Sequence, residues 1–182
     1  METLGVVLRP AREGDFDRLL ELYEAVAGEG QWIGGEAPVD RVGFERRFHS
    51  EFLESTEPAT MLLAMADDRV VGNVGLRLER GVVDLGMMVA ADWRGRGVGS
   101  MLMEAGVSWA RGTGAHKLAL YLWPHNVAAR RLYDKFGFVE EGRLRRHYRR
   151  RNGELWDCVV MGLVFDETSP GRTVTGPGRP ER

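Results

Sequence analysis

The feature that most constrains this chain is a buried strand that leads into a helix through a glycine-rich turn. Residues Val82–Val89 are mostly apolar and include several valines, which favours a buried strand. Apolar residues then recur at helical spacing over 97–109, so a helix is expected to begin among the glycines. A strand followed closely by a helix points to an α/β fold.

The turn between these elements reads Arg-Gly-Arg-Gly-Val-Gly at 94–99 and suits an anionic oxygen. The first amides of a helix lack partners inside the helix and lie at the positive end of its dipole. The glycines remove side chains that would keep a ligand from those amides. Arg94 and Arg96 add positive charge. We therefore interpret the turn as a cradle for a pyrophosphate.

Two common phosphate motifs do not match this turn. A dinucleotide fingerprint that uses Gly95 and Gly97 needs a third glycine where the chain has Ser100, and a P-loop needs Gly-Lys-Ser/Thr, which is absent. The pattern present is Arg-x-x-Gly-x-Gly, formed by Arg94, Gly97 and Gly99. After an apolar strand, this pattern resembles the acetyl-CoA motif of the GNAT superfamily of N-acyltransferases.

A second segment resembles another recurrent segment of the same superfamily. Residues 126–138 are similar to the superfamily's Asn-x-x-Ala-x-x-Leu-Tyr-x-x-x-Gly-Phe. Seven residues of a helix turn through about 700°, so Asn126 and Tyr133 are expected to point the same way, with Arg130 near that face. If the apolar residues of this helix were only core residues, the first motif would stay unexplained.

The remaining patterns give the chain one consistent order of elements. They predict strands at 4–9, 60–66, 70–78, 82–89 and 118–123, helices near 15–27, 40–53, 97–112 and 126–136, and a hairpin of 138–150 and 154–165. This is the order of the GNAT fold, an α/β fold whose mixed central sheet has about seven strands flanked by about four helices. Asp15 is expected to cap the first helix. We assign 1–165 to one GNAT acetyltransferase domain and 166–182 to a disordered C-terminal tail.

Composition limits the class of protein and its compartment. A net charge of −2 argues against a general polyanion binder. The single cysteine, Cys158, allows no internal disulfide and lies in an apolar run, where a buried cysteine is more usual than an acyl-carrying nucleophile. No signal peptide and no apolar run near the ~20 residues of a membrane span are found. The histidines show no metal-ligand spacing. We expect a cytoplasmic protein without a metal, a membrane anchor or a nucleic-acid partner.

The resemblance implies an acetyl-CoA-dependent N-acetyltransferase, with acetyl-CoA as co-substrate. The acceptor would be the primary amine of an amino acid, a small amine or a peptide N-terminus, and it would attack the thioester directly in a ternary complex. A non-catalytic acyl-CoA-binding or RNA-associated module, which uses the six arginines of 143–151, stays open as an alternative. Those arginines are otherwise expected to form a solvated edge strand. A homodimer through the exposed hairpin also stays open.

The resemblance also implies roles for individual residues. Tyr133 is expected to be the general acid, because a phenol of pKa ~10 is protonated at neutral pH and can donate to a thiolate of pKa roughly 8.5. The general base stays open between Asp84, Glu29 or Glu36, and ordered water. The residues expected to contact acetyl-CoA are Met88 and Val89 at the acetyl group or pantetheine, Arg94, Gly95, Arg96, Gly97, Val98, Gly99 and Ser100 at the pyrophosphate, Asn126 at the pantetheine or a water, and Arg130 at a phosphate.

Overall fold

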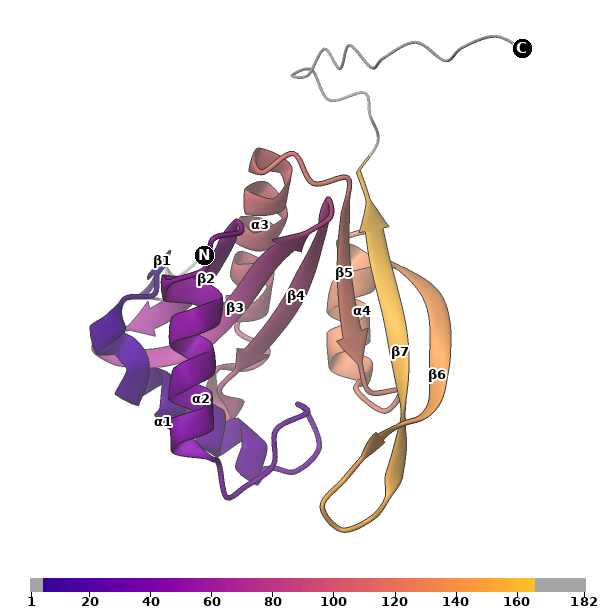
Figure 1. The fold of residues 1–182 in the computed structure, drawn as a ribbon, viewed down its shortest axis with the longest axis horizontal. Coiled ribbons are helices and arrows are strands. Elements are labelled where there is room, and N and C mark those ends of the chain that lie inside the picture. Colours follow the sequence, from indigo (N-terminus) through magenta and orange to yellow (C-terminus); the bar gives the residue numbers. More distant parts are fainter. Residues whose placement is uncertain (1–4, 166–182) are drawn as a thin grey trace, which may run out of the picture.

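The computed structural model describes residues 5–165, which form a seven-stranded sheet with helices on both faces (Figure 1). The strands are β1 (Val6–Pro10), β2 (Ala59–Ala66), β3 (Arg69–Glu79), β4 (Val82–Val89), β5 (Lys117–Leu122), β6 (Val139–Arg149) and β7 (Leu155–Val164). The helices are α1 (Phe16–Gly28), α2 (Arg41–Phe48), α3 (Val98–Gly112) and α4 (Val127–Lys135). The predicted α/β fold with a mixed sheet is confirmed. The predicted disordered tail, 166–182, lies outside the described residues.

The structure refines one predicted helix and corrects the predicted role of Asp15. The helix expected at 40–53 is α2 followed by a π-helical segment, His49–Leu53, although Asp40 does cap α2 by accepting a hydrogen bond from the Gly43 amide at 3.1 Å. Asp15 is the N-cap residue of α1, as predicted, but its side chain accepts no hydrogen bond from the amides of that helix. Its buried carboxylate instead accepts two hydrogen bonds of 2.6 Å from the Arg9 guanidinium, and this contact anchors β1 to the start of α1.

The apolar core forms two layers, one on each face of the sheet. On one face α3 and α4 cover the strands, with Leu102 and Leu118 fully buried. On the other face α1 and α2 pack over β2 and β3, with Leu19 and Leu63 fully buried. Because successive side chains of a strand point to opposite faces, each central strand serves both layers. Within 5–165, no helix is long and apolar enough to cross a membrane.

The sheet opens between its two parallel strands. Its order is β1-β2-β3-β4-β5-β7-β6, and every pair is antiparallel except β4 with β5. That pairing joins Val82–Leu85 to Lys117–Leu120 and stops there, and Figure 1 shows the two strands diverging beyond it. Both strands end at the same end of the sheet. The N-termini of α3 and α4 follow them in the chain and lie at that end. One end of the sheet therefore combines an unpaired strand edge with two helix N-termini.

The final two strands form the predicted hairpin. Its turn is closed by the Arg150 amide, which donates to the Glu154 carbonyl, and Gly153 has a φ of +89°. Between Leu144 and Tyr148 the register of β6 shifts, and the tip of the hairpin lies against the loop that joins α1 to α2. The tip of the hairpin thus meets the α1–α2 loop at the open end of the sheet.

Candidate active site

Two cavities meet where β4 and β5 separate. Cavity A has a volume of about 690 Å³ and lies between β4, β5 and the N-terminal ends of α3 and α4. Cavity B has a volume of about 720 Å³ and lies under α1, α2 and the loop between them. The two cavities share Ile33, Gly34, Gly86, Met87, Met88 and Tyr148. A molecule in cavity A can therefore touch a molecule in cavity B at the open edge of β4.

The glycine-rich turn forms one end of cavity A. Gly95 and Gly97 have φ values of +73° and +93°, in the left-handed region that a glycine adopts without strain. Gly97 is the N-cap residue of α3 and no side chain caps the helix, so its first amides remain available. Gly99 and Ser100 also line the cavity. This end of cavity A suits a phosphate group.

Two residues of the turn that were expected to bind a cofactor lie outside the lining of cavity A. The side chain of Val98 is fully buried in the core beneath α3. The guanidinium of Arg96 stacks over the Trp93 ring at 5.4 Å from its centre. These two residues would bind an anion through their backbone amides, and Arg96 would also attract it through its long-range charge.

Arg94 lines cavity A but is already engaged by Glu29. Its two terminal nitrogens donate to the two carboxylate oxygens of Glu29 at 2.7 and 2.6 Å, and its Nε donates to the Val89 carbonyl at 3.0 Å. Trp32 also donates to Glu29, at 2.6 Å. The hydrogen bonds from Arg94, and then the one from Trp32, hold the pKa of Glu29 below its ordinary value. This pair ties the end of α1 to the glycine-rich turn.

Asn126 and Tyr133 both line cavity A. Asn126 caps α4, since its Oδ1 accepts a hydrogen bond of 3.1 Å from the Ala129 amide. The Tyr133 side chain is 6% exposed, and burial raises the pKa of its hydroxyl to about 12. The Tyr133 hydroxyl is therefore fully protonated at neutral pH. Arg130, in contrast, lies outside the cavity lining and is paired with Glu140.

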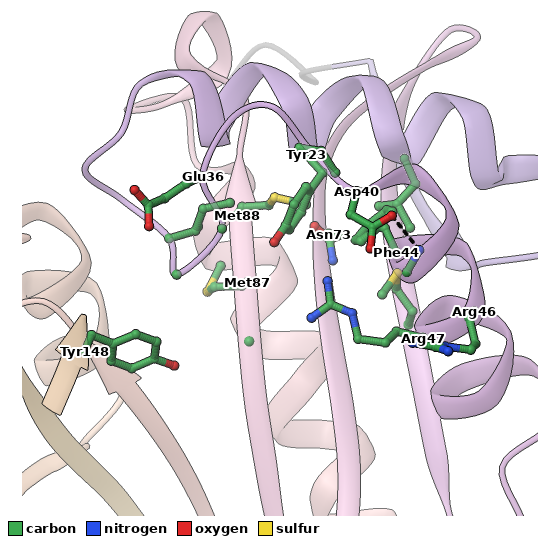
Figure 2. Close-up of a pocket in the computed structure, with 18 of the residues that line it drawn as sticks. Tyr23, Glu36, Asp40, Phe44, Arg46, Arg47, Asn73, Met87, Met88 and Tyr148 are labelled. Atoms are coloured by element: carbon green, nitrogen blue, oxygen red, sulfur yellow. Dashed lines mark hydrogen bonds between the residues drawn. The ribbon is translucent and has the colours of Figure 1, made fainter. Parts of the chain in front are cut away.

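The lining of cavity B combines an apolar floor with charged groups at its margin (Figure 2). Tyr23 and Phe44 stack with their ring centres 4.4 Å apart. Glu36 accepts hydrogen bonds of 3.1 and 3.3 Å from the Arg151 amide. Within the described residues, no carboxylate lies within 4.0 Å of the guanidinium of Arg46 or Arg47, although both line the cavity. Cavity B therefore contains two arginines without a direct ion-pair partner in 5–165, beside the carboxylates of Glu36 and Asp40.

Asp84 lies away from both cavities. Its carboxylate is 3.2 Å from the Arg77 guanidinium, its side chain is half exposed, and it lines neither cavity. Cys158 does line cavity A, where burial raises the pKa of its thiol. In 5–165, His, Cys, Asp and Glu side chains form no group that could hold a metal ion.

The sequence alone did not reveal the role of Arg150. Five of the six hairpin arginines are exposed, as expected, but Arg150 is only 4% exposed. Its guanidinium donates to the carbonyls of Gly30 at 3.1 Å and Ile33 at 3.2 Å, and it lies 4.4 Å from the centre of the Trp156 ring. The contact with Ile33 spans 117 positions of the chain, so no local pattern distinguishes this arginine from its neighbours. Arg150 holds the loop that lines both cavities.

Comparisons with known proteins point to one family. Residues 19–138 match the model of the Acetyltransferase (GNAT) family. An L-amino acid N-acetyltransferase, AaaT, of Escherichia coli K12 is 27% identical over 168 residues, which cover 87% of this chain and 98% of that protein. An L-methionine sulfoximine/L-methionine sulfone acetyltransferase of Pseudomonas aeruginosa PAO1 is 27% identical over 174 residues, with 91% and 98% covered.

A solved structure shows the same fold with a ligand present. It is a GNAT superfamily phosphinothricin acetyltransferase from Sinorhizobium meliloti in complex with AcCoA. The two chains superpose with a TM-score of 0.78 at 18% sequence identity, over 95% of each chain. At this identity the likeness concerns the fold.

Proposed function

Because this chain belongs to the GNAT acetyltransferase family, we propose that it transfers the acetyl group of acetyl-CoA to the primary amine of an amino acid held in cavity B. The family supplies the type of reaction and the co-substrate. The curated relatives described above are named for amino-acid acceptors. One observation carries the proposal for this chain: two cavities, each of about 700 Å³, meet at Gly86, Met87 and Met88. That arrangement lets donor and acceptor meet without an acyl-enzyme.

Cavity A suits acetyl-CoA. The uncapped amides at the start of α3 would bind the pyrophosphate, because they combine free donors with the positive end of the helix dipole. The edge of β4 beyond Leu85 has no partner on β5, so its backbone groups are free to bind the amide-rich pantetheine arm. The side-chain amide of Asn126 would add a donor beside that arm.

Tyr133 is proposed as the general acid. As the acceptor nitrogen bonds to the carbonyl carbon, the carbon–sulfur bond breaks and the Tyr133 hydroxyl donates its proton to the leaving sulfur. Burial keeps this hydroxyl protonated, with a pKa of about 12. The same water-poor surroundings raise the pKa of the leaving thiol. The pKa difference between the Tyr133 hydroxyl and that thiol is therefore smaller.

Ordered water is proposed to take the proton from the acceptor amine. Glu29 is held by Arg94 and Trp32, which lower its pKa and make it a poor base. Asp84 is paired with Arg77 outside both cavities. Glu36 lines cavity B, but its carboxylate accepts hydrogen bonds from the Arg151 amide. We expect Glu29→Gln, Asp84→Asn and Glu36→Gln each to retain the acidic limb of the pH–rate profile, and loss of that limb in one variant would identify it as the base.

Arg46 and Arg47 favour an acceptor that carries a carboxylate. Both residues line cavity B, and in the described part of the chain neither forms an ion pair, so an amino-acid carboxylate could pair with them there. Thiol release from acetyl-CoA should therefore be faster with L-amino acids than with the corresponding amines that lack the carboxyl group. Equal rates for the two sets would contradict this choice of acceptor.

The decisive test of the activity combines thiol release with calorimetry. Wild-type protein should release free CoA thiol from acetyl-CoA when an amino acid is added, and Tyr133→Phe should lower kcat by about 100-fold. CoA affinity measured by calorimetry should change less than twofold in that variant. Binding of CoA without thiol release for any amine would instead support a non-catalytic acyl-CoA-binding module.

The proposal also covers location and assembly. A cytoplasmic location fits a chain whose single cysteine, Cys158, is buried and unpaired. We propose that no nucleic acid is needed for the activity. The exposed edge of β6 is the candidate contact for a homodimer, and sedimentation of the purified protein tests this part of the proposal.

A further inference from the structure

Asn73 is a buried polar side chain whose hydrogen bonding is incomplete. It lies on β3, is 5% exposed, and lines cavity B. Its Oδ1 atom has no hydrogen-bond partner within residues 5–165. The other two buried polar side chains of this region, Asp15 and Arg150, are each held by several partners. A buried amide oxygen without a partner destabilises a fold, so its retention calls for an explanation.

The position of Asn73 places it beside the junction of the two cavities. On the ladder between β3 and β4 it stands opposite Met88, which both cavities share. Residues that face each other across a ladder project on the same face of the sheet, so the Asn73 amide lies next to the Met88 side chain. In Figure 2 Asn73 and Arg47 lie on one side of cavity B and Tyr148 lies on the other. Asn73 is thus the buried amide at the reacting end of this cavity.

Packing does not require an amide at this position. The lining of cavity B around it includes the apolar side chains of Met61, Phe44 and Met88 as well as Arg47 (Figure 2). Leucine has the branched shape of asparagine with a larger volume, and it would leave no unpaired polar atom. A rotation of 180° about the terminal bond exchanges the oxygen and nitrogen of the amide, so either end can face the cavity. The amide is therefore suited to a ligand rather than to the core.

We propose that Asn73 binds the reacting amine of the acceptor. This inference rests on the proposed function, in which cavity B holds the acceptor. The Oδ1 of Asn73 is buried away from the cavity, so the amide turns by 180° to bring this oxygen to the cavity, where it accepts a hydrogen bond from one N–H of the amine and leaves the nitrogen lone pair free to attack the thioester carbon. A neutral amide oxygen is too weak a base to remove a proton, so Asn73 positions the amine and does not deprotonate it.

This role defines the class of amine that the site accepts. When the new carbon–nitrogen bond forms, the nitrogen of a primary amine carries two hydrogens. One hydrogen leaves as a proton to water, while the other stays on the nitrogen and keeps its hydrogen bond to Asn73. The departing sulfur receives its own proton from Tyr133. A secondary amine has one hydrogen at that stage, which must leave, so the bond to Asn73 is lost. The site therefore selects primary amines over their N-methyl counterparts.

The test compares Asn73→Leu with wild type in three measurements. We expect kcat/KM for the amino-acid acceptor to fall at least tenfold, mainly through KM. The CoA affinity should stay within twofold, and the melting temperature should stay equal or rise because an unpaired buried oxygen has been removed. An unchanged kcat/KM in a folded Asn73→Leu, with wild-type activity present, would overturn this inference and leave the proposed function intact.

A second variant separates selectivity from packing. Asn73→Ala makes room rather than filling it, so it covers the case in which leucine prevents folding. Wild type should prefer a primary amine to its N-methyl form by at least tenfold, and Asn73→Ala should reduce that preference several-fold. An equal preference in the two proteins would overturn the inference. Absence of thiol release from wild type with every primary amine would overturn the proposed function, and this inference with it.

Discussion

Replacement of Arg150 by alanine is expected to lower the free energy of unfolding by about 3 kcal/mol and to release the loop that lines both cavities. The Arg150 guanidinium is 4% exposed, and its Nε lies 3.5 Å from the Glu36 carboxylate. It also donates to the carbonyls of Gly30 and Ile33. The variant therefore removes the shared partner of three groups in one loop.

The magnitude follows from these contacts. Removing one member of a buried ion pair costs about 3–5 kcal/mol, chiefly because the other charge is left without a partner. Here the Glu36 side chain is 22% exposed, so water can hydrate it and the lower end of that range applies. Loss of the stacking on Trp156, whose ring centre is 4.4 Å from the guanidinium, is worth about 1 kcal/mol and is included in this figure.

Two further variants calibrate the experiment. Arg149 is the exposed neighbour of Arg150, and Arg149→Ala should change the free energy of unfolding by less than about 0.5 kcal/mol. Arg150→Lys keeps the charge but loses the planar fork that reaches two carbonyls at once, so about half of the destabilisation should remain. This variant also serves if Arg150→Ala unfolds.

The assay is urea unfolding followed by tryptophan fluorescence, together with the KM for the acceptor. We expect the acceptor KM to rise at least tenfold in Arg150→Ala, because the loop contributes Ile33 and Gly34 to both cavities. Equal unfolding midpoints for the alanine variants at 149 and 150 would refute the reasoning. So would a destabilised Arg150→Ala whose acceptor KM is that of wild type.

Three other predictions concern the glycine-rich turn and two titrating groups. Gly97→Ala should weaken CoA binding at least tenfold by calorimetry, since Gly97 has a φ of +93°, whereas Gly112→Ala at the far end of α3 should bind CoA normally. Because the pKa of Tyr133 is raised to about 12, its contribution to stability is present below the unfolded pKa of ~10 and is lost as the pH rises through 12. The difference in unfolding free energy between wild type and Tyr133→Phe should fall by about 2–3 kcal/mol over that interval. The Arg9 hydrogen bonds lower the pKa of Asp15, so its contribution is present above the unfolded pKa of ~3.9 and is lost in acid. Asp15→Asn should be less stable at pH 7 and show a flatter dependence of the urea midpoint on acid pH.

Much of the fold could be predicted because the signals that define it are local. The apolar run with its valines predicted the bounds of β4, Val82–Val89, to the residue, and the final hairpin was predicted as the two runs 138–150 and 154–165. The prediction that failed, a helix cap by the Asp15 side chain, also rested on a local signal. Asp15 has the residue type of a helix cap, but Arg9 and the Arg12 amide compete for its carboxylate, and a preference for a cap cannot anticipate such partners.

The candidate site was harder to predict, because its residues are assembled across the chain. Motif resemblance selected Gly97, Gly99, Asn126 and Tyr133, all of which line cavity A, and their roles remain predictions. Resemblance could not indicate that Arg94 is engaged by a carboxylate 65 positions away. The motif therefore located the anion site without showing which charges are free to act there.

Hydrophobic periodicity, turn residues and two motifs were enough to specify the family fold and the glycine-rich helix start, since each depends on neighbours within a few positions. Packing of distant segments specified the rest: the parting of β4 from β5, the second cavity, the burial of Arg150 and the unpaired amide of Asn73. The physical reason is that burial and hydrogen-bond satisfaction depend on which segments meet in space. The neighbours of an arginine in the sequence are the same whether its side chain contacts water or a buried carbonyl.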